Sequence, residues 1–504
     1  MDKKVVSKVI VICLAIAFTL LISIEWLYAN IGGISIDEIV FHLKVPMKGT
    51  STDMVWKYLI QCPWKIIAAT TLVSWLLIYP MKKDLKIIDK IATSQAAKTV
   101  TVSLCIALLI LAGSMGQLVY ATNITGYIIN QIDKSTLIEE EYVNPKEVNV
   151  EFAGQKRNLI YIFLESMETT FYSKKDGGLS EKDLMPEISQ LAKENLNFSN
   201  TDQIGGAYVF TGTEWTVAAM TAQTCGVPLK IGIEDNSLSE YSAFLDGAHS
   251  IGEILEDNGY NNFLLLGSDA VFGGRKNLFE QHGNYEIWDV ESAMAEKRIS
   301  EKVWWGYSDD NLFEFAKEKI LKLSQEEKPF NFTTLTVDTH FQDGYKCEDC
   351  PNKWDEQYKN VISCSSQKVG EFIKWIKEQD FYENTTIVIS GDHLSMQSNF
   401  FELTEGQEYE KKVVNIIINP AIEPTNTARI YSTLDMYPTT LAAMGATIEG
   451  NKLGLGTNLF SEEQTLIEKY GFEYVDKELR KVSKFYDDNI LVECKKGKKG
   501  TGPF

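Results

Sequence analysis

The chain has 504 residues, which is long enough for more than one domain, and its hydrophobic content of 44% is ordinary for a folded protein. Its formal net charge of −20 argues against a nucleic acid as partner, because such partners require a basic surface. A negative total does not exclude an anionic lipid as substrate, since a local group of arginine, lysine and metal can oppose it.

Three long apolar segments lie in the first quarter of the chain, at residues 9–28, 58–80 and 100–122. Each is close to the ~20 residues that a helix needs to cross the hydrocarbon core. The first segment could instead be a signal peptide, but no small-residue cleavage site follows it and two more spans come after it. Residues 1–122 are therefore predicted to form a multi-pass transmembrane anchor.

The distribution of lysines predicts the orientation of this anchor. Lysines precede the first span and recur through the 81–98 loop, whereas the 32–55 loop holds only Lys44 and Lys48. The positive-inside rule places the lysine-rich parts in the cytoplasm, so three crossings leave everything after about residue 123 outside. Whether the 32–55 loop touches substrate cannot be read from the sequence.

A domain outside the cytoplasm permits disulfides. The four cysteines of its globular part, Cys225, Cys347, Cys350 and Cys364, allow three complete pairings, and their spacing does not choose among them; Cys494 lies in the C-terminal tail. Cys347 and Cys350 could instead be half of a zinc site, although no second CxxC follows.

The rest of the chain alternates strand-like and helix-like segments behind a partly helical linker at residues 123–157. The predicted strands are 158–165, 262–267, 330–336, 385–390 and 413–418. The predicted helices are 186–196, 251–258, 309–324, 357–379 and 437–444. This alternation predicts an α/β catalytic domain over residues 158–460, with a mainly parallel sheet between helix layers, followed by a C-terminal extension at 461–504.

Several groups with chemical potential follow the predicted strands. Glu165 ends the first strand, and Asp392 and His393 come directly after the fourth. The carboxyl ends of parallel strands share one edge of a sheet, where sites are built. Mixed oxygen and nitrogen ligands suit Mn²⁺, Zn²⁺ or Mg²⁺. Alone, each group is more often surface polarity or a structural residue; together they predict a metal site.

Three further residues complete the predicted site. Thr216 supplies a hydroxyl that becomes a usable nucleophile only when a divalent cation lowers its pKa. Arg275, in a glycine-flanked loop, can clamp phosphate oxygens. His340 follows the third strand and can protonate a leaving alcohol.

These residues lie in motifs that resemble a known family. They are Glu165-Ser-Met-Glu-Thr-Thr-Phe171, Trp215-Thr-Val-Ala-Ala-Met220 running to Cys225-Gly-Val-Pro-Leu229, Leu335-Thr-Val-Asp-Thr-His340 and Gly391-Asp392-His393. Over roughly residues 158–460 the chain resembles the membrane-bound phosphoglycerol transferases of the alkaline phosphatase–sulfatase superfamily. It is similar to lipoteichoic acid synthase and more closely to the periplasmic-glucan enzyme.

The resemblance implies one divalent metal ion, with Mn²⁺ favoured, held by Glu165, Thr216, Asp392 and His393. It implies Thr216 as nucleophile, with Thr213 as the alternative, and contacts from Arg275 and His340 to the phosphoglycerol. The implied reaction moves phosphoglycerol from phosphatidylglycerol to an extracytoplasmic glycan or glycolipid through a threonine-linked intermediate. Diacylglycerol is released at the surface of a bacterial cell membrane.

Two departures and two alternatives stand beside this interpretation. Gly273 occupies the position of an aromatic residue in lipoteichoic acid synthase, and the chain ends soon after the matched region, whereas the glucan enzymes continue. Both differences leave the identity of the acceptor open.

The same scaffold could transfer phosphoethanolamine or hydrolyse sulfate esters, although the Cys225 segment lacks the arginine of a sulfatase motif. The other alternative is an inactive, membrane-anchored binding protein.

Overall fold

The computed structural model describes residues 3–31, 53–83, 92–230, 244–397 and 409–492. The chain divides into two compact units, with the boundary between Ile128 and Ile129. We call them the anchor unit and the globular unit. The 32–55 loop, apart from its last residues, and the end of the C-terminal extension lie outside the described residues.

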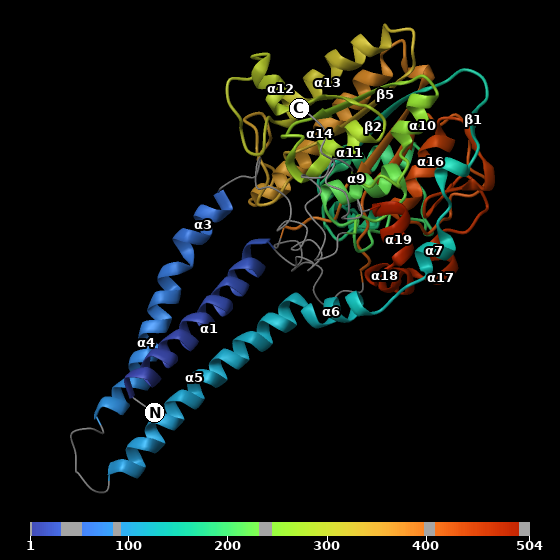
Figure 1. The fold of residues 1–504 in the computed structure, drawn as a ribbon. Coiled ribbons are helices and arrows are strands. Elements are labelled where there is room, and N and C mark those ends of the chain that lie inside the picture. The colour runs from blue at the N-terminus through green and yellow to red at the C-terminus, as the bar shows by residue number, and fades with distance from the viewer. Residues whose placement is uncertain (1–2, 32–52, 84–91, 231–243, 398–408, 493–504) are drawn as a thin grey trace, which may run out of the picture. The chain divides into compact units, whose positions relative to one another are not determined.

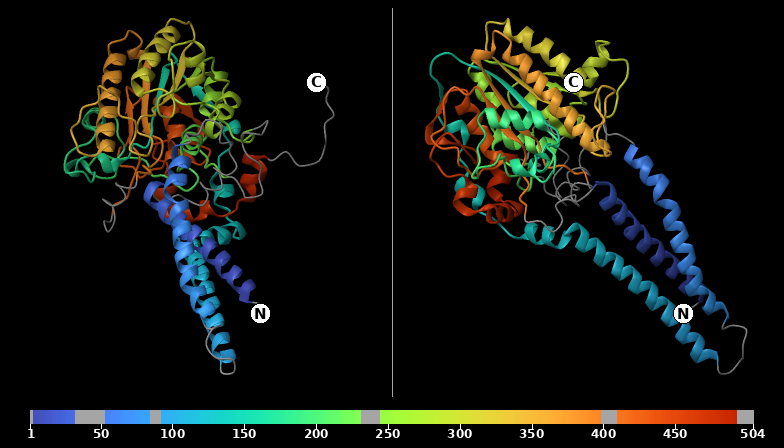
Figure 2. Two further views of the ribbon diagram at one scale, coloured as in Figure 1. Left: turned by 90° about the vertical axis from the view of Figure 1, so that its left-hand side faces the viewer. Right: turned by 180° about the vertical axis from the view of Figure 1, so that it is seen from behind.

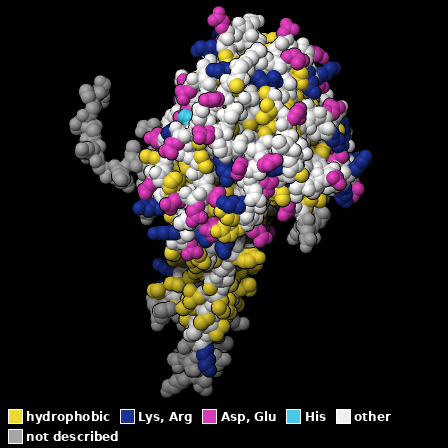
Figure 3. All heavy atoms as spheres, turned by 90° about the vertical axis from the view of Figure 1, so that its right-hand side faces the viewer, with side chains coloured by type: hydrophobic (Ala, Val, Ile, Leu, Met, Phe, Trp, Pro, Cys, Tyr) yellow, Lys and Arg dark blue, Asp and Glu magenta, His cyan; other side chains and the backbone are white. Residues whose placement is uncertain are grey.

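The anchor unit consists of long apolar helices. They are α1 (Lys3–Ile31), α3 (Asp53–Gln61), α4 (Pro63–Lys83) and α5 (Ala92–Thr122). Within the described residues, three helical stretches are long and apolar enough to cross a membrane, at Lys4–Asn30, Val55–Met81 and Lys98–Thr122. They overlap the three predicted spans. Apolar side chains also cover the outer faces of these helices (Figure 3), including exposed Ile12, Ile67 and Leu109.

The globular unit is built on a six-stranded sheet with the strand order β4-β3-β5-β2-β6-β7. Its first five strands are mutually parallel and β7 runs antiparallel to β6, so the predicted mainly parallel sheet is confirmed. The strands are β2 (Asn158–Leu164), β3 (Asn261–Leu266), β4 (Glu286–Trp288), β5 (Phe330–Leu335), β6 (Thr385–Gly391) and β7 (Asn415–Ile418).

The central strand β2 is buried on both faces, and this explains its nearly unbroken apolar sequence. Leu159, Tyr161 and Phe163 belong to one hydrophobic core, whereas the alternate residues Ile160 and Ile162 belong to a second core on the other face. Successive side chains of a strand point to opposite faces, so this one seven-residue strand contributes side chains to both cores.

Each core is closed by a layer of helices (Figures 1 and 2). The second core is covered by α8 (Pro186–Glu194), α13 (Asp309–Ser324) and α14 (Gln357–Lys377). The first core is covered by α9 (Thr216–Cys225), α10 (Ile251–Asp257), α11 (Arg275–Gln281) and α16 (Met436–Ala443).

The linker contributes to the globular unit. It forms the helices α6 (Ile124–Ile132) and α7 (Leu137–Glu141), and then the strand β1 (Val150–Phe152), which pairs antiparallel with β8 (Ala446–Ile448). Glu141 accepts hydrogen bonds from Lys469 Nζ and Tyr470 Oη, each at 2.6 Å. These partners lie on α17 (Leu466–Tyr470), which precedes α18 (Phe472–Arg480). The linker and the C-terminal extension therefore pack together.

We predict that Ile162→Ala lowers the free energy of unfolding by about 2–5 kcal/mol, because it opens a cavity in a fully buried strand. Ile422→Ala is the matched control, since Ile422 is 43% exposed and its truncation should cost less than about 0.5 kcal/mol. Denaturant unfolding of the full chain in detergent, followed by tryptophan fluorescence, measures both. Equal midpoints for the two variants would contradict the assigned core.

Candidate active site

The pairing of β2 with β6 brings two acidic residues to the same edge of the sheet. Leu164, the last residue of β2, lies opposite Gly391, the last residue of β6. The next residue on each strand is therefore a carboxylate, Glu165 or Asp392, and both are buried. Parallel pairing in this register explains how residues so distant in sequence share one site.

The backbone just after β2 holds both carboxylates in place. Ser166 adopts a left-handed conformation with a φ of 56°, which is uncommon for a residue other than glycine. Its backbone N–H donates to Asp392 Oδ1 at 2.8 Å, and its hydroxyl donates to Glu165 Oε1 at 2.7 Å. Unusual backbone conformations of this kind persist only where surrounding contacts enforce them, and they concentrate at functional sites.

Glu165, Asp392 and His393 form a group that could hold a metal ion, with one ligand atom from each within 4.8 Å of the others. His393 Nδ1 lies 2.8 Å from the Leu394 carbonyl oxygen, which only accepts hydrogen bonds, so in the neutral ring Nδ1 carries the proton and Nε2 is the nitrogen available to a metal. This Nε2 lies 3.4 Å from Glu165 Oε1 and 3.5 Å from Asp392 Oδ2. Ligands bound to one ion at ~2.1 Å lie roughly 3.0–3.4 Å apart, so the group fits a single cation.

The electrostatics of this group also favour a cation. Burial and the charge of Glu165 both raise the pKa of Asp392. Burial opposes the charging of His393, but Asp392 and Glu165 raise its pKa. Asp392 Oδ2 is buried and receives no hydrogen bond from the described part of the chain. Two adjacent buried carboxylates with an unused oxygen are a suitable environment for a divalent ion.

Thr216 is the first residue of α9 and lines a pocket together with Glu165, Arg275 and His340. The alternative residue, Thr213, is fully buried. Its hydroxyl donates to the Phe210 carbonyl at 2.8 Å and accepts from the Phe210 N–H at 3.0 Å. The Thr213 hydroxyl is thus used inside its own turn, whereas Thr216 faces the pocket at a helix N-terminus, where negative charge is stabilised.

Arg275 begins α11 behind two glycines with positive φ, 70° at Gly273 and 81° at Gly274. An L-residue would be strained at either position, so the turn requires glycine at both. The guanidinium donates through Nε to the Phe272 carbonyl at 3.0 Å and through Nη2 to the Asp269 carbonyl at 2.7 Å. Burial lowers the pKa of Arg275 to about 10, so the group remains a cation.

His340 follows β5 and is partly buried. Its Nδ1 lies 2.7 Å from the Phe341 carbonyl oxygen and so carries the proton, which leaves Nε2 as an acceptor. Burial lowers the pKa of His340, although the charge of Glu165 opposes this, so the ring is neutral at pH 7. The ring packs against Trp305, with the ring centroids 4.4 Å apart.

The pocket also contains residues that the motifs did not indicate. Phe272 and Trp305 form an aromatic wall, and Ser268 adds a hydroxyl group; Thr336, which does lie in the 335–340 motif, adds another. Two adjacent tryptophans, Trp304 and Trp305, in a loop between helices were the one signal in the sequence that could have located this wall. All six residues predicted for the site lie at this edge of the sheet; their roles remain predictions.

Comparisons with known proteins agree with this architecture. The sulfatase family model matches residues 157–446. The chain is 31% identical over 325 residues to phosphoglycerol transferase I from Escherichia coli (strain 55989 / EAEC), which covers 63% of this chain and 40% of that relative. The chain thus spans two fifths of the length of this curated relative.

Two solved structures were also similar. The lipoteichoic acid synthase LtaP from Listeria monocytogenes is 18% identical, with a TM-score of 0.49, covering 65% of this chain and 82% of LtaP. The Streptococcus pyogenes phosphoglycerol transferase GacH, in complex with sn-glycerol-1-phosphate, is 15% identical, with a TM-score of 0.44, covering 71% of this chain and 90% of GacH. The resemblance to phosphoglycerol transferases noted in the motifs is confirmed by the curated relative. The family match covers more than half of the chain, and the chain therefore belongs to the sulfatase family.

Proposed function

We propose that the chain is a metal-dependent transferase that moves phosphoglycerol from phosphatidylglycerol to a hydroxyl of an extracytoplasmic glycan or glycolipid. The observation that carries this proposal is one pocket that joins a helix-terminal hydroxyl, a buried guanidinium and a neutral imidazole, contributed by Thr216, Arg275 and His340. The name of the curated relative supports phosphoglycerol as the transferred group. The three apolar helices keep the enzyme at the bilayer, so the donor lipid need not leave it.

Glu165, Asp392, His393 and the Thr216 hydroxyl would hold the divalent ion, and Mn²⁺ is favoured over Mg²⁺ and Zn²⁺. When bound, such an ion lowers the pKa of a hydroxyl and polarises a phosphoryl oxygen. The catalytic globular unit lies outside the cytoplasm, and its Cys350–Cys364 disulfide supports this location.

In the first half-reaction, Thr216 Oγ1 attacks the phosphorus atom of phosphatidylglycerol. The neutral Nε2 of His340 takes the hydroxyl proton of Thr216, and a bond forms between the Thr216 oxygen and phosphorus. The bond from phosphorus to the diacylglycerol oxygen breaks, and the His340 imidazolium gives its proton to that oxygen. The product is a glycerophospho-threonine. Arg275 and the N-terminus of α9 oppose the negative charge on the phosphoryl oxygens, and Arg275 needs no reorganisation because two carbonyls already hold it.

In the second half-reaction, His340 acts as a base. Its neutral Nε2 takes the proton of the acceptor hydroxyl, whose oxygen attacks phosphorus and displaces Thr216. The imidazolium formed in this way gives its proton to the displaced Thr216 oxygen, which restores the hydroxyl and the neutral imidazole. Over the two half-reactions the acceptor hydroxyl loses one proton and diacylglycerol gains one, as the overall reaction requires.

The pocket favours glycerol over ethanolamine as the transferred head group. Glu165 is the only carboxylate among the described residues that line the pocket, and it belongs to the candidate metal group. An ethanolamine ammonium would lack a carboxylate partner of its own there. Ser268 and Thr336 offer hydroxyls, which suit the hydroxyls of glycerol.

We predict that Mn²⁺ raises the thermal unfolding midpoint of the chelator-treated full chain. A ligand at about 100 times its dissociation constant adds about 2.7 kcal/mol to stability. Asp392→Asn should lose most of this shift, because it removes a ligand charge. Asp355→Asn, at an exposed position, should keep it. An Asp392→Asn protein that responds like wild type would exclude the proposed metal site.

We predict that Thr216→Ala lowers diacylglycerol release from labelled phosphatidylglycerol by about three orders of magnitude or more, because the nucleophilic oxygen is lost. Thr213→Ala serves as the matched control and should retain turnover. Purified full chain with Mn²⁺ is assayed in mixed micelles. Retained release by Thr216→Ala would exclude this nucleophile, and release from phosphatidylethanolamine alone would replace the proposed donor.

A further inference from the structure

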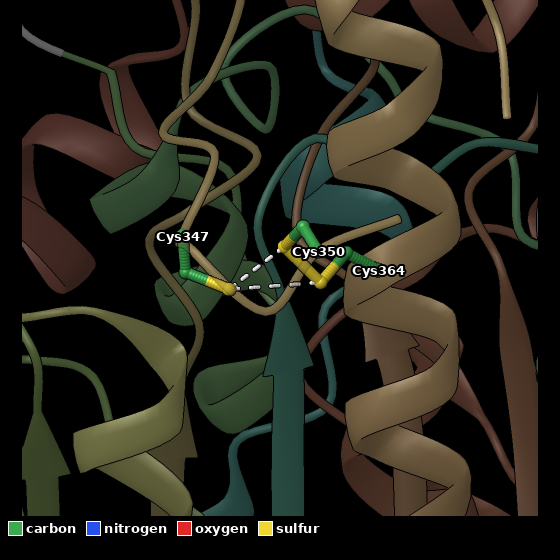
Figure 4. A group of neighbouring side chains, drawn as sticks. All are labelled: Cys347, Cys350 and Cys364. Carbon is green, nitrogen blue, oxygen red and sulfur yellow. Dashed lines mark hydrogen bonds between the residues drawn. A yellow bond between two sulfur atoms is a disulfide. The ribbon is translucent and has the colours of Figure 1, made fainter. Parts of the chain in front are cut away.

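Three cysteines cluster between β5 and the first half of α14 (Figure 4). Cys350, in the loop, forms a disulfide with Cys364 on α14. Cys347 Sγ lies 2.8 Å from Cys350 Sγ and 3.9 Å from Cys364 Sγ. Cys225 is a separate thiol, buried in the first core. The structure thus contains one of the possible bridges and leaves Cys347 as a thiol beside it.

The position of Cys347 gives Cys350 two possible partners. We propose that the three cysteines form a thiol–disulfide exchange site, at which Cys350 changes its partner from Cys364 to Cys347. The Cys347 thiol loses its proton and attacks Cys350 Sγ, the bond between Cys350 and Cys364 breaks, and Cys364 leaves as a thiolate that takes up a proton. No oxidant or reductant is consumed, because the chain holds one disulfide and one thiol both before and after the exchange.

The two disulfides restrain different parts of the chain. The Cys350–Cys364 bridge joins positions separated by 14 residues and ties the loop to α14. A Cys347–Cys350 bridge would close a small ring inside the loop and leave α14 without a covalent tether. Exchange therefore changes how firmly this helix holds the loop, without changing the number of disulfides.

This loop carries His340 at its start, so the tether acts close to the active site. Tyr358, at the beginning of α14, donates its hydroxyl to the Thr339 carbonyl at 2.9 Å. Lys368, one turn beyond Cys364, pairs with Asp338 at 2.9 Å. With the disulfide, these contacts hold the loop to α14. After exchange, only the non-covalent contacts remain.

The surroundings of Cys347 favour the observed bridge as the resting form. Burial raises the pKa of the Cys347 thiol, and the nearby Lys368 ammonium lowers it. The thiol is thus mainly protonated at neutral pH, which slows exchange without preventing it.

The chain's own lysines make the two bridges distinguishable by mass. Trypsin cleaves after Lys346, Lys353, Lys359 and Lys368, giving the peptides 347–353 and 360–368. With the Cys350–Cys364 bridge these peptides are joined, and N-ethylmaleimide caps Cys347. With the Cys347–Cys350 bridge, peptide 347–353 carries an internal disulfide, and the cap is on Cys364.

The experiment incubates the oxidised full chain in detergent, without added thiol, at a pH of about 8.5, near the ordinary thiol pKa. Samples are capped at intervals and digested at mildly acidic pH. We expect the internal disulfide to increase from a small initial fraction, with an equal gain of cap on Cys364. Joined peptides capped at Cys347 throughout the time course would overturn the proposal.

Three variants complete the test. Cys364→Ser should form the internal Cys347–Cys350 disulfide, and two capped cysteines in peptide 347–353 would overturn the proposal. Cys347→Ser should keep the joined peptides at all times. Cys225→Ser, which removes the remote thiol, should follow the wild-type time course. The wild-type result needs no variant to fold, and none of these measurements depends on transferase activity.

Hydrogen exchange tests the tether itself. Amides in residues 338–346 should exchange faster in Cys364→Ser than in Cys347→Ser, because only the second variant keeps the loop tied to α14. Equal rates would show that the bridge does not restrain the His340 loop.

Discussion

The site depends on the burial of two carboxylates side by side. Glu165 and Asp392 lie at the ends of adjacent parallel strands, and strand register leaves neither free to move away. Two negative charges in such a place repel each other and lose hydration, so the arrangement is stable only with protons or a cation between them. His393 reaches both carboxylates, and Ser166 bonds to both. The surrounding residues therefore provide the fixed frame that a metal-dependent reaction needs.

The carboxyl edge of the parallel sheet brings the other predicted site residues to this pair of carboxylates. A parallel sheet covered on both faces has only its edges open to ligands, and its carboxyl edge collects the residues that follow each strand. Thr216 and Arg275 reach the same edge from α9 and α11, two helices of one layer. His340 comes from the loop after β5, the strand beside β2. The proposed nucleophile, phosphate clamp and proton acceptor thus reach one pocket from two helices and one loop.

Long apolar runs made most of this architecture predictable from the sequence. The strand at 158–164 and the helix at 309–324 agree with the predictions to within one residue, because burial on two faces or one leaves a clear pattern. Glu165 and Asp392 were predictable because each directly follows such a run. β1 was missed, since it has only three residues and its partner β8 lies almost 300 residues later.

Two choices that the sequence left open, between two threonines and between two cysteine partners, depend on contacts in the folded chain. Thr213 and Thr216 have the same side chain, but Thr213 is fully buried and bonded to Phe210, whereas Thr216 lines the pocket. The pairing of Cys350 with Cys364 rather than Cys347 likewise depends on how the loop crosses α14, which spacing alone does not determine. In both cases the residue types are evident from the sequence, whereas the contacts made in the folded chain determine which of two equivalent hydroxyls or sulfur atoms is engaged.

The turn before Arg275 shows how a local backbone conformation shapes the pocket. Positive φ at Gly273 and Gly274 lets α11 begin with the guanidinium facing the pocket, and any residue other than glycine would be strained at these two positions. The aromatic surface beside this turn comes from Phe272, whose ring centroid lies 5.6 Å from the guanidinium carbon, and from Trp305, whose ring centroid lies 5.6 Å from that of Phe272. Trp305 also packs on His340, so the aromatic wall is continuous with the residue proposed to move the proton. A change in the packing of this wall would therefore shift the His340 ring as well, which couples the shape of the pocket to the position of the proposed base.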